Sequence, residues 1–355
     1  MHKTIEGKPL TDILARFVVE TPGANVPSAA IDPAKDLILD TIGVALAAAP
    51  HPIGKTIIDY VTARRGAPAS ATVWGAGIRV VPEMAALANG TLANALDFDE
   101  GSHLPTHILP AALAVAEEQC LSGRDVLDAF IVGYEAGARL TQVIDARRRQ
   151  QRGPTHQGWW HVGLVGPITA ALTVCRLLKL DRSQAATTIG IAACGCGGFR
   201  RNMGTMAKAL HSGNAARLGV EAASLAQSGF AADREIIEAP LGFLEAVCPR
   251  EDRDEAAITE RLGRPYMLEA PLRIKQFPAC NPGPSADRRR AAALRPTRFF
   301  CQRDRIDRGR LAHLLATPAA PLGRDISRVQ RRLSLGGKPT ARHLWSRSAQ
   351  RRNGA

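Results

Sequence analysis

The stretch GLVGPITAALTVCRLL, residues 163–178, decides the fold class of this chain. It is apolar and rich in small residues, longer than an ordinary strand and shorter than a membrane span, so it predicts a buried helix. Strand signals are scarce elsewhere, and the sequence therefore predicts a mainly α protein. Further Ala-rich helices, separated by Gly, Pro and Asp, are predicted over residues 34–49, 82–96, 109–121, 124–144, 181–193 and 205–227.

Turn residues and small residues predict how these helices begin, end and pack. Asp32-Pro33 fits a helix start with proline in the first turn, and Gly123 and Gly229 stand where glycines commonly end helices. Residues 71–81 predict one short hairpin. Because Ala and Gly carry little side-chain bulk, the helix axes are expected to approach closely in a compact, layered domain.

Charge divides the chain into two unequal parts. Residues 1–283 hold 28 Lys and Arg against 29 Asp and Glu, whereas residues 284–355 hold 18 against 4. The C-terminal segment also lacks a helical or strand period. Three explanations stay open for it: a basic tail that binds polyanions, a solvated extension, or translation in the wrong reading frame, which we favour because composition and periodicity fail together. Nucleic-acid binding ranks last, since the segment has few aromatic residues.

Several classes of protein are excluded or disfavoured. No run approaches the roughly 20 apolar residues that cross a bilayer, so no membrane association is expected. Seven cysteines without paired spacing, and an N-terminal stretch without an apolar signal segment, predict a cytoplasmic protein. Neither Cys194 and Cys196 nor the glycines beside them form a metal or dinucleotide motif, so no metal and no cofactor are expected.

Residues 94–107, NALDFDEGSHLPTH, gather three carboxylates and two imidazoles between two predicted helices. Loops held by rigid elements are where sites tend to be built. His103 and His107 are four residues apart, but Pro105 between them favours an extended turn over a helical metal-binding pair. Each acid taken alone fits a surface or capping role equally well, and the density of the cluster is what favours a site.

Three other segments place polar groups in apolar surroundings. His161 follows two tryptophans, and burial beside them would disfavour its charged form, although a hydrogen-bonded core histidine is the simpler interpretation. Lys208 lies in an Ala-rich helix and faces either water or a polar cavity, where it would bind a carboxylate. Lys275 and Cys280 fall in an extended, Pro-containing segment.

Taken together, these segments resemble the MmgE/PrpD family, whose members include 2-methylcitrate dehydratases and cis-aconitate decarboxylase. The resemblance runs from residue 10 to residue 282, in order and at family-like spacing. It rests on ALDFDE at residues 95–100 with His107, GWWH at 158–161, GTMAK at 204–208 and IKQFPAC at 274–280.

The resemblance implies a domain organisation that this chain only begins. A large all-helical domain is expected over residues 1–265 and the start of a smaller α/β lid domain over residues 266–283. The Arg-rich segment 284–355, interpreted as disordered or out of frame, stands where the rest of the lid and a returning helical segment would follow. The chain is therefore interpreted as a truncated or frameshifted member of a family that usually forms homodimers.

The resemblance also implies a cofactor-independent lyase that acts on a small di- or tricarboxylic acid. A 2-methylcitrate dehydratase of propionate metabolism is favoured, because the decarboxylase has a threonine where this chain has Gly101 and a histidine where it has Cys280. Decarboxylation of cis-aconitate and a catalytically inactive fragment are the alternatives.

Site residues are carried over position by position from the family motifs. Two lysines are expected to clamp substrate carboxylates, His161 or His107 to move a proton, and Asp97 to orient a histidine and raise its pKa. All five catalytic residues are expected to converge on one polar hollow. The catalytic residues are Asp97, His107, His161, Lys208 and Lys275, and the substrate-binding residues are His103, Lys208, Lys275 and Cys280.

Overall fold

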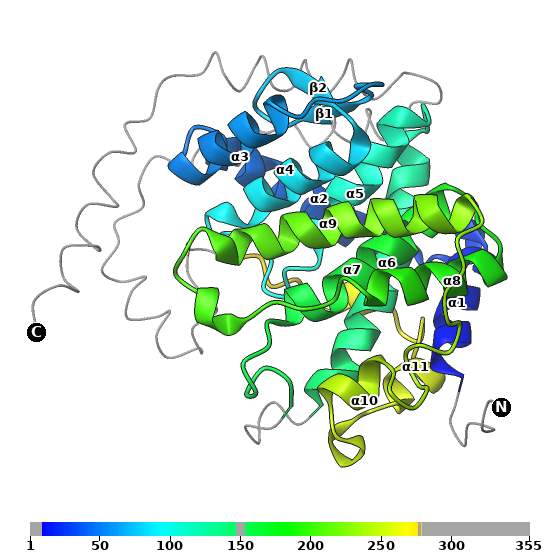
Figure 1. The fold of residues 1–355 in the computed structure, drawn as a ribbon. Coiled ribbons are helices and arrows are strands. Elements are labelled where there is room, and N and C mark those ends of the chain that lie inside the picture. Colours follow the sequence, from blue (N-terminus) through cyan, green and yellow to red (C-terminus); the bar gives the residue numbers. More distant parts are fainter. Residues whose placement is uncertain (1–8, 147–152, 276–277, 279–355) are drawn as a thin grey trace, which may run out of the picture.

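The computed structural model describes residues 9–146, 153–275 and 278, which form layers of helices with one small hairpin at an edge (Figure 1). The fold is mainly α, as the sequence predicts. The helices and strands are α1 (Leu10–Glu20), α2 (Ser28–Ala48), α3 (Pro52–Thr62), β1 (Ala71–Val73), β2 (Ile78–Val80), α4 (Pro82–Ala95), α5 (Pro105–Glu118), α6 (Gly123–Asp145), α7 (His161–Leu177), α8 (Arg182–Ala193), α9 (Ala207–Gln227), α10 (Phe243–Val247) and α11 (Ala256–Thr259). Short 3-10 turns are η1 (Gly23–Asn25), η3 (Arg200–Asn202), η4 (Arg250–Asp252) and η5 (Met267–Glu269).

Helix α7 forms the centre of the core. All of its residues except Arg176 are buried, which explains why its sequence is apolar on every side. It packs against α5, α6, α8 and α9. Helix α9 runs across the molecule and contacts α7 on one side and α4 on the other (Figure 1).

Glycines set the close approach of α9 to both neighbours. A Cβ added to Gly219 would lie 2.4 Å from the Cβ of Ala170 in α7, and one added to Gly213 would lie 2.3 Å from the main-chain oxygen of Leu87 in α4. Neither distance is compatible with a side chain at that position. The predicted close packing of small-residue helices is therefore confirmed, and it brings the N-terminal turn of α9 towards the loop that follows α4.

Several predicted helix boundaries are wrong for identifiable reasons. Helix α2 begins at Ser28 and contains Pro33, so the proline lies in the second turn and does not start the helix. Helix α5 begins at Pro105, whose fixed φ suits the first helical position, and not at residue 109. Gly123 is the first residue of α6, where Ser122 and Asp125 form a capping box, while Gly229 follows α9 with a φ of 91° as expected for a helix end.

The predicted hairpin over residues 71–81 is confirmed. Strands β1 and β2 pair antiparallel, with Ala71 opposite Val80. Asn89 of α4 completes the hairpin edge, because its side-chain amide donates to the main-chain oxygen of Thr72 and accepts from the main-chain nitrogen of Trp74, both at 2.9 Å. Asn89 therefore has a structural role.

A buried carboxylate ties the segment after α11 to the helical body. Glu135 of α6 accepts from the main-chain nitrogens of Gly263 at 2.8 Å and Met267 at 2.6 Å, and from Arg139 at 2.7 Å. From this anchor, residues 270–275 run without regular structure towards the loop between α4 and α5. There the main-chain nitrogen of Gly101 donates to the main-chain oxygen of Arg273 at 3.1 Å.

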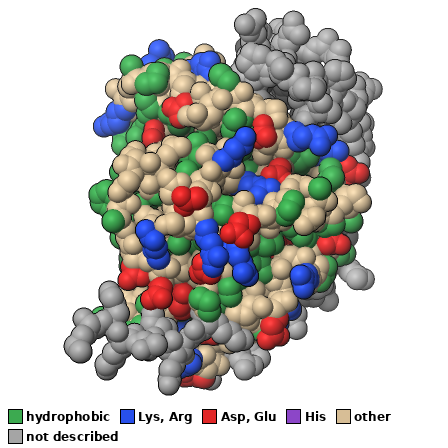
Figure 2. Space-filling view, turned by 90° about the vertical axis from the view of Figure 1, so that its right-hand side faces the viewer, with side chains coloured by type: hydrophobic (Ala, Val, Ile, Leu, Met, Phe, Trp, Pro, Cys, Tyr) green, Lys and Arg blue, Asp and Glu red, His purple; other side chains and the backbone are tan. Residues whose placement is uncertain are grey.

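Some sequence predictions lie at or beyond the limits of the described residues. Cys280 and residues 284–355 lie outside them, and the start of a lid domain at residues 266–283 stays a prediction. None of the described helices alone is long and apolar enough to span a bilayer, and only α2 and α3 together pass that test, across a bend of 90°. Acidic and basic side chains are interspersed on the face shown in Figure 2, in keeping with the balanced charge of residues 1–283.

Candidate active site

The loop between α4 and α5 carries the acidic cluster on a strained backbone. Asp97 and His103 have φ angles of 51° and 63°, in the left-handed region that residues with a Cβ seldom adopt. Each such residue costs on the order of 1–3 kcal/mol and persists only where its surroundings hold it. Thr106 of α5 donates to the main-chain oxygen of His103 at 2.7 Å, and Lys275 donates to that of Asp97 at 3.3 Å. The strained loop is thus held at both ends.

Two lysines from distant parts of the chain hold Asp97. Lys208, the second residue of α9, donates to Asp97 Oδ1 at 2.9 Å, and Lys275 donates to the same oxygen at 2.8 Å. The lysine side chains are 10% and 7% exposed, whereas that of Asp97 is 27% exposed. Burial works against ionisation of Asp97, but the two ammonium groups outweigh it and hold the pKa of the carboxyl below its usual range. Two cations therefore converge on a single carboxylate oxygen.

Asp99 forms a second, fully buried network beside Asp97. It accepts from Nδ1 of His103 and, at 3.2 Å, from the side-chain amide of Asn94, and its other oxygen lies 3.5 Å from Nζ of Lys275. Burial alone would raise the pKa of Asp99, but the charges of His103 and Lys275 hold it well below its usual range. Asp99 is the carboxylate that contacts His103, whereas Asp97 contacts the two lysines, and the histidine-orienting role expected for Asp97 stays a prediction.

His161 begins α7 next to this cluster. Its Nε2 lies 3.3 Å from the main-chain oxygen of Ser102, and its ring centroid lies 4.5 Å from that of Trp160 and 5.8 Å from that of His103. The preceding residues are fixed by a hydrogen bond of 2.9 Å from the main-chain nitrogen of Trp160 to the oxygen of Gly198. His161 is buried beside Trp160.

His107 lies in the first turn of α5 and is completely buried. Within the described part of the chain, neither of its ring nitrogens has a hydrogen-bond partner. Burial, reinforced by the charge of His103, lowers the pKa of His107 to about 3, so that its ring is neutral near pH 7. Because His103 precedes the helix that contains His107, the two do not form a helical pair, as the sequence predicts.

Comparison with known proteins identifies the family. A model of the MmgE/PrpD N-terminal domain matches residues 12–256. The chain belongs to the MmgE/PrpD family. It is 29% identical over 245 residues to a cis-aconitate decarboxylase of Homo sapiens, a match that covers 66% of this chain and 50% of the relative. It is 31% identical over 273 residues to a cis-aconitate decarboxylase of Aspergillus terreus, which covers 72% of this chain and 54% of the relative. The chain thus spans about half the length of the curated relatives it matches.

In this MmgE/PrpD chain the structure brings most of the sequence-predicted site residues together. Asp97, Lys208 and Lys275 are joined by ion pairs, and the rings of His103 and His161 are neighbours. The resemblance that placed these residues in one site came from four separate motifs.

Sequence reasoning assigned no role to Asn94 or Asp99, although both lie in the quoted loop. Asn94 is the last but one residue of α4 and is 1% exposed, and Asp99 is 0% exposed. Two signals in the sequence could have identified them. Asn94 is a polar residue at the end of an otherwise apolar helix, and Asp99 is an acid four residues before a histidine.

Asp97, Asp99 and His103 are also a group of described residues whose ligand atoms lie within 4.8 Å of one another, close enough to hold a metal ion. The ammonium of Lys275, however, lies 2.8 Å from an oxygen of Asp97 and 3.5 Å from one of Asp99. A lysine cation already neutralises both carboxylates, which favours an anion-binding site over a metal site.

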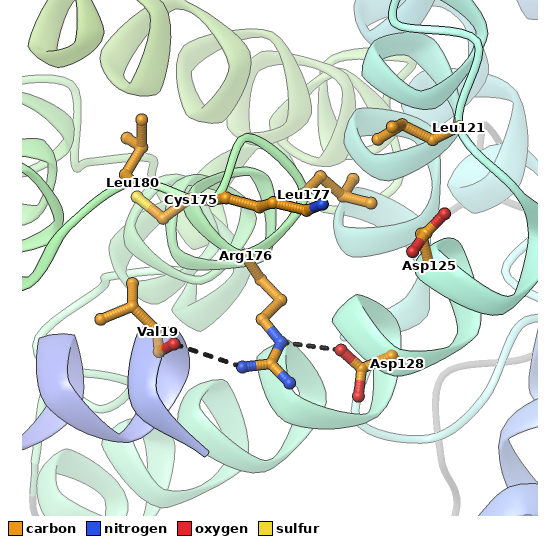
Figure 3. A pocket seen from close by; sticks show the side chains of 9 residues that line it. Val19, Leu121, Asp125, Asp128, Cys175, Arg176, Leu177 and Leu180 are labelled. Carbon is orange, nitrogen blue, oxygen red and sulfur yellow. Dashed lines mark hydrogen bonds and ion pairs between the residues drawn. The ribbon is translucent and has the colours of Figure 1, made fainter. Parts of the chain in front are cut away.

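The hollow in Figure 3 lies elsewhere in this family member. It has a volume of about 240 Å³ and is lined by residues of α1, α6 and α7 and the segments beside them. Arg176 crosses it to bind Asp128 at 2.7 Å and the main-chain oxygens of Val18 and Val19 at 3.0 and 3.5 Å, which ties three helices together. The polar hollow expected around the five catalytic residues stays a prediction.

Proposed function

We propose that this chain is a lyase that acts on a small di- or tricarboxylic acid. The observation that carries the proposal is the convergence of the Lys208 and Lys275 ammonium groups on one oxygen of Asp97. Two nearly buried cations that share one carboxylate oxygen have the geometry to share a substrate carboxylate in the same way.

Lys208 and Lys275 are the proposed carboxylate clamps, and both are cations in nearly buried surroundings, where charge is poorly screened. Lys208 stands at the N-terminal end of α9, where the helix dipole favours anions and opposes a lysine. A ligand carboxylate bound there is stabilised by both the lysine and the helix end. In the absence of a ligand, Asp97 supplies the counter-charge.

Proton transfer falls to the histidines next to the clamps. The sequence assigns it to His161 or His107, and the ring of His161 lies beside that of His103. Any elimination that forms or consumes a carbanion beside a carboxylate needs such a group. Substrate binding by Cys280 stays a prediction, as do the homodimer and the cytoplasmic setting.

Decarboxylation of a cis-aconitate-like substrate is the first candidate reaction, because the curated relatives are cis-aconitate decarboxylases. Dehydration of a 2-methylcitrate-like substrate is the second. Its support is Gly101, where a Cβ would lie 3.3 Å from the Cβ of Arg273. A threonine, which the decarboxylase has at this position, would crowd the segment that carries Lys275.

Incubation of the purified chain with cis-aconitate, 2-methylcitrate and citrate tests the proposal. Loss of substrate and appearance of product are followed by proton NMR, with carbon dioxide release separating decarboxylation from dehydration. The variant Lys208→Met, which keeps the side-chain length without the charge, should consume each substrate at least about 10-fold more slowly. If none of the three acids is consumed by the wild-type chain, the proposal is wrong.

A further inference from the structure

The neighbours of His103 fix which of its ring nitrogens carries a proton. Asp99 is ionised, so its oxygens can only accept hydrogen bonds, and the contact with His103 requires a proton on Nδ1. The side-chain amide of Asn94 donates to the same Asp99 oxygen at 3.2 Å and so restrains the carboxylate. Both supporting side chains are buried, with exposures of 1% for Asn94 and 0% for Asp99.

The remaining nitrogen of this ring, Nε2, is left available for a ligand. No residue in the described ranges forms a hydrogen bond with it, whereas Nδ1 donates to Asp99. A ring nitrogen of His103 lies within 4.8 Å of a carboxylate oxygen of Asp97, the group on which the two lysines converge. A ligand carboxylate that replaces Asp97 between the lysines would therefore lie next to the imidazole.

The other two histidines are less suited to be the first proton carrier. His107 is completely buried in the first turn of α5, and neither of its ring nitrogens has a hydrogen-bond partner among the described residues. Nε2 of His161 lies 3.3 Å from the main-chain oxygen of Ser102, which can only accept, so that nitrogen carries a proton and is already engaged.

We infer that His103 exchanges the proton with the bound polycarboxylate, with His161 as its neighbouring imidazole, and that Asp99 and Asn94 are positioning residues for His103. The inference rests on the proposed function and goes further than it, since it assigns the proton transfer to a residue that the sequence expected only to bind substrate. A carboxylate that fixes the tautomer and orientation of a histidine is an established way of preparing it for this task.

The proton balance is simple for both candidate reactions. In decarboxylation, the C–C bond to one carboxylate breaks, carbon dioxide leaves, and the electron pair stays on carbon, which takes the proton from Nε2 of His103; water then reprotonates the ring. In dehydration, Nε2 accepts the C–H proton, the C–H electrons form the double bond, and hydroxide leaves with a proton from solvent; the ring then returns the C–H proton to water. Nδ1 keeps its proton towards Asp99 throughout.

Steady-state kinetics of three variants test the inference. His103→Gln should lower kcat by at least about 10²-fold with little change in KM. Asp99→Asn should lower kcat by about 10²-fold or more, because the amide no longer favours a proton on Nδ1. Asp12→Asn, at an exposed ion pair with Arg182, is the matched control and should behave as wild type. A wild-type kcat in His103→Gln, or a loss confined to KM in Asp99→Asn, overturns the inference.

A binding experiment keeps the inference separate from the proposed function. The chain is labelled with ¹⁵N-histidine and titrated with tricarballylate, a saturated tricarboxylate, while a thermal shift monitors binding. The Nε2 resonance that is absent in His103→Gln should move in the wild type as the ligand binds. If tricarballylate binds and that resonance does not move, the inference is overturned and the proposed function stands. If the resonance moves but no acid is turned over, the placement of His103 beside the ligand is supported, but the proposed function and the proton transfer that rests on it both fail.

Discussion

The ammonium group of Lys275 binds both the side chain and the main chain of Asp97: Nζ lies 2.8 Å from Oδ1 and 3.3 Å from the carbonyl oxygen of that residue. One ammonium group therefore joins the segment after α11 to the strained loop after α4. Since Lys208 binds the same Oδ1, the conformation of the loop and the placement of both cations depend on each other. A ligand that replaces the Asp97 carboxylate would therefore affect the loop conformation and the positions of both lysines.

The first prediction is that both lysines bind ligand carboxylates. Lys208→Gln and Lys275→Gln should each weaken binding of tricarballylate roughly 10- to 100-fold, because each removes a charge-assisted hydrogen bond of about 1.5–3 kcal/mol. Isothermal titration calorimetry at low ionic strength measures the change. Lys35→Gln, at a partly exposed lysine that pairs with Asp32, is the control and should bind like wild type. Equal affinities in all three variants would remove the lysines from the binding site.

The second prediction concerns His161. His161→Gln should lower turnover by roughly 10²-fold or more, because the imidazole next to His103 is lost. The glutamine amide can still donate to the main-chain oxygen of Ser102, so the melting temperature should stay near that of wild type. Turnover and thermal unfolding are measured on the same preparation, and unchanged turnover would exclude His161 from the mechanism.

The sequence predicted the helical class because residues 163–178 are apolar over a length that only a buried helix fits. It placed the helix starts less well, because proline is compatible with more than one position. Pro33 lies inside α2, and Pro105 begins α5 where an extended turn was expected. Such choices depend on contacts with other helices, which local sequence does not contain.

The site was predicted residue by residue only through family motifs. Chemistry alone could not show that Lys208 and Lys275 meet at Asp97, because their convergence is set by the packing of α9 on α4 and by the Glu135 anchor. It assigned the histidine-orienting role to Asp97, whereas in the structure Asp99 contacts His103. Asp97 and Asp99 are two residues apart, and only the positive φ of Asp97 and the burial of Asp99 distinguish them.

The third prediction tests the anchor of the Lys275 segment. Glu135→Gln leaves the guanidinium of Arg139 buried without its counter-charge and weakens the acceptor for Gly263 and Met267. We expect the free energy of unfolding to fall by about 3 kcal/mol, as for other buried pairs that lose one partner. Urea denaturation measures it. Glu221→Gln, at a half-exposed pair with Arg217, should change stability by less than about 1 kcal/mol.

The fourth prediction tests the close contact between α7 and α9. Gly219→Ala should lower the free energy of unfolding by about 1–3 kcal/mol, because the new methyl group would lie 2.4 Å from the Cβ of Ala170. Gly43→Ala makes the same change in α2, where nothing lies within 4 Å of the new Cβ. That control should gain about 0.5–1 kcal/mol from helix propensity. If Gly219→Ala is as stable as Gly43→Ala, the helices do not pack as described.

The fifth prediction concerns stability in acid. An unfolded chain protonates a histidine near pH 6.5, whereas burial keeps folded His107 neutral down to about pH 3. Between these values the unfolded state binds more protons than the folded state. The contribution of this residue to the free energy of unfolding therefore decreases as the pH is lowered, by up to about 1.4 kcal/mol per pH unit. His107→Leu removes that dependence. As the pH is lowered from 7 to 4.5, the free energy of unfolding of this variant should approach that of the wild type and then exceed it.

Comparison of the two proteins at each pH isolates the effect of His107, because other groups contribute equally to both. Glu117, for example, has a pKa raised mainly by burial and acts in the opposite direction, since its folded form holds a proton that the unfolded form has lost. His156→Leu, at an exposed histidine, is the control and should keep the wild-type pH dependence. If the stability difference between wild type and His107→Leu is the same at pH 7 and pH 4.5, His107 titrates normally in the folded protein and is not the enclosed neutral imidazole described here.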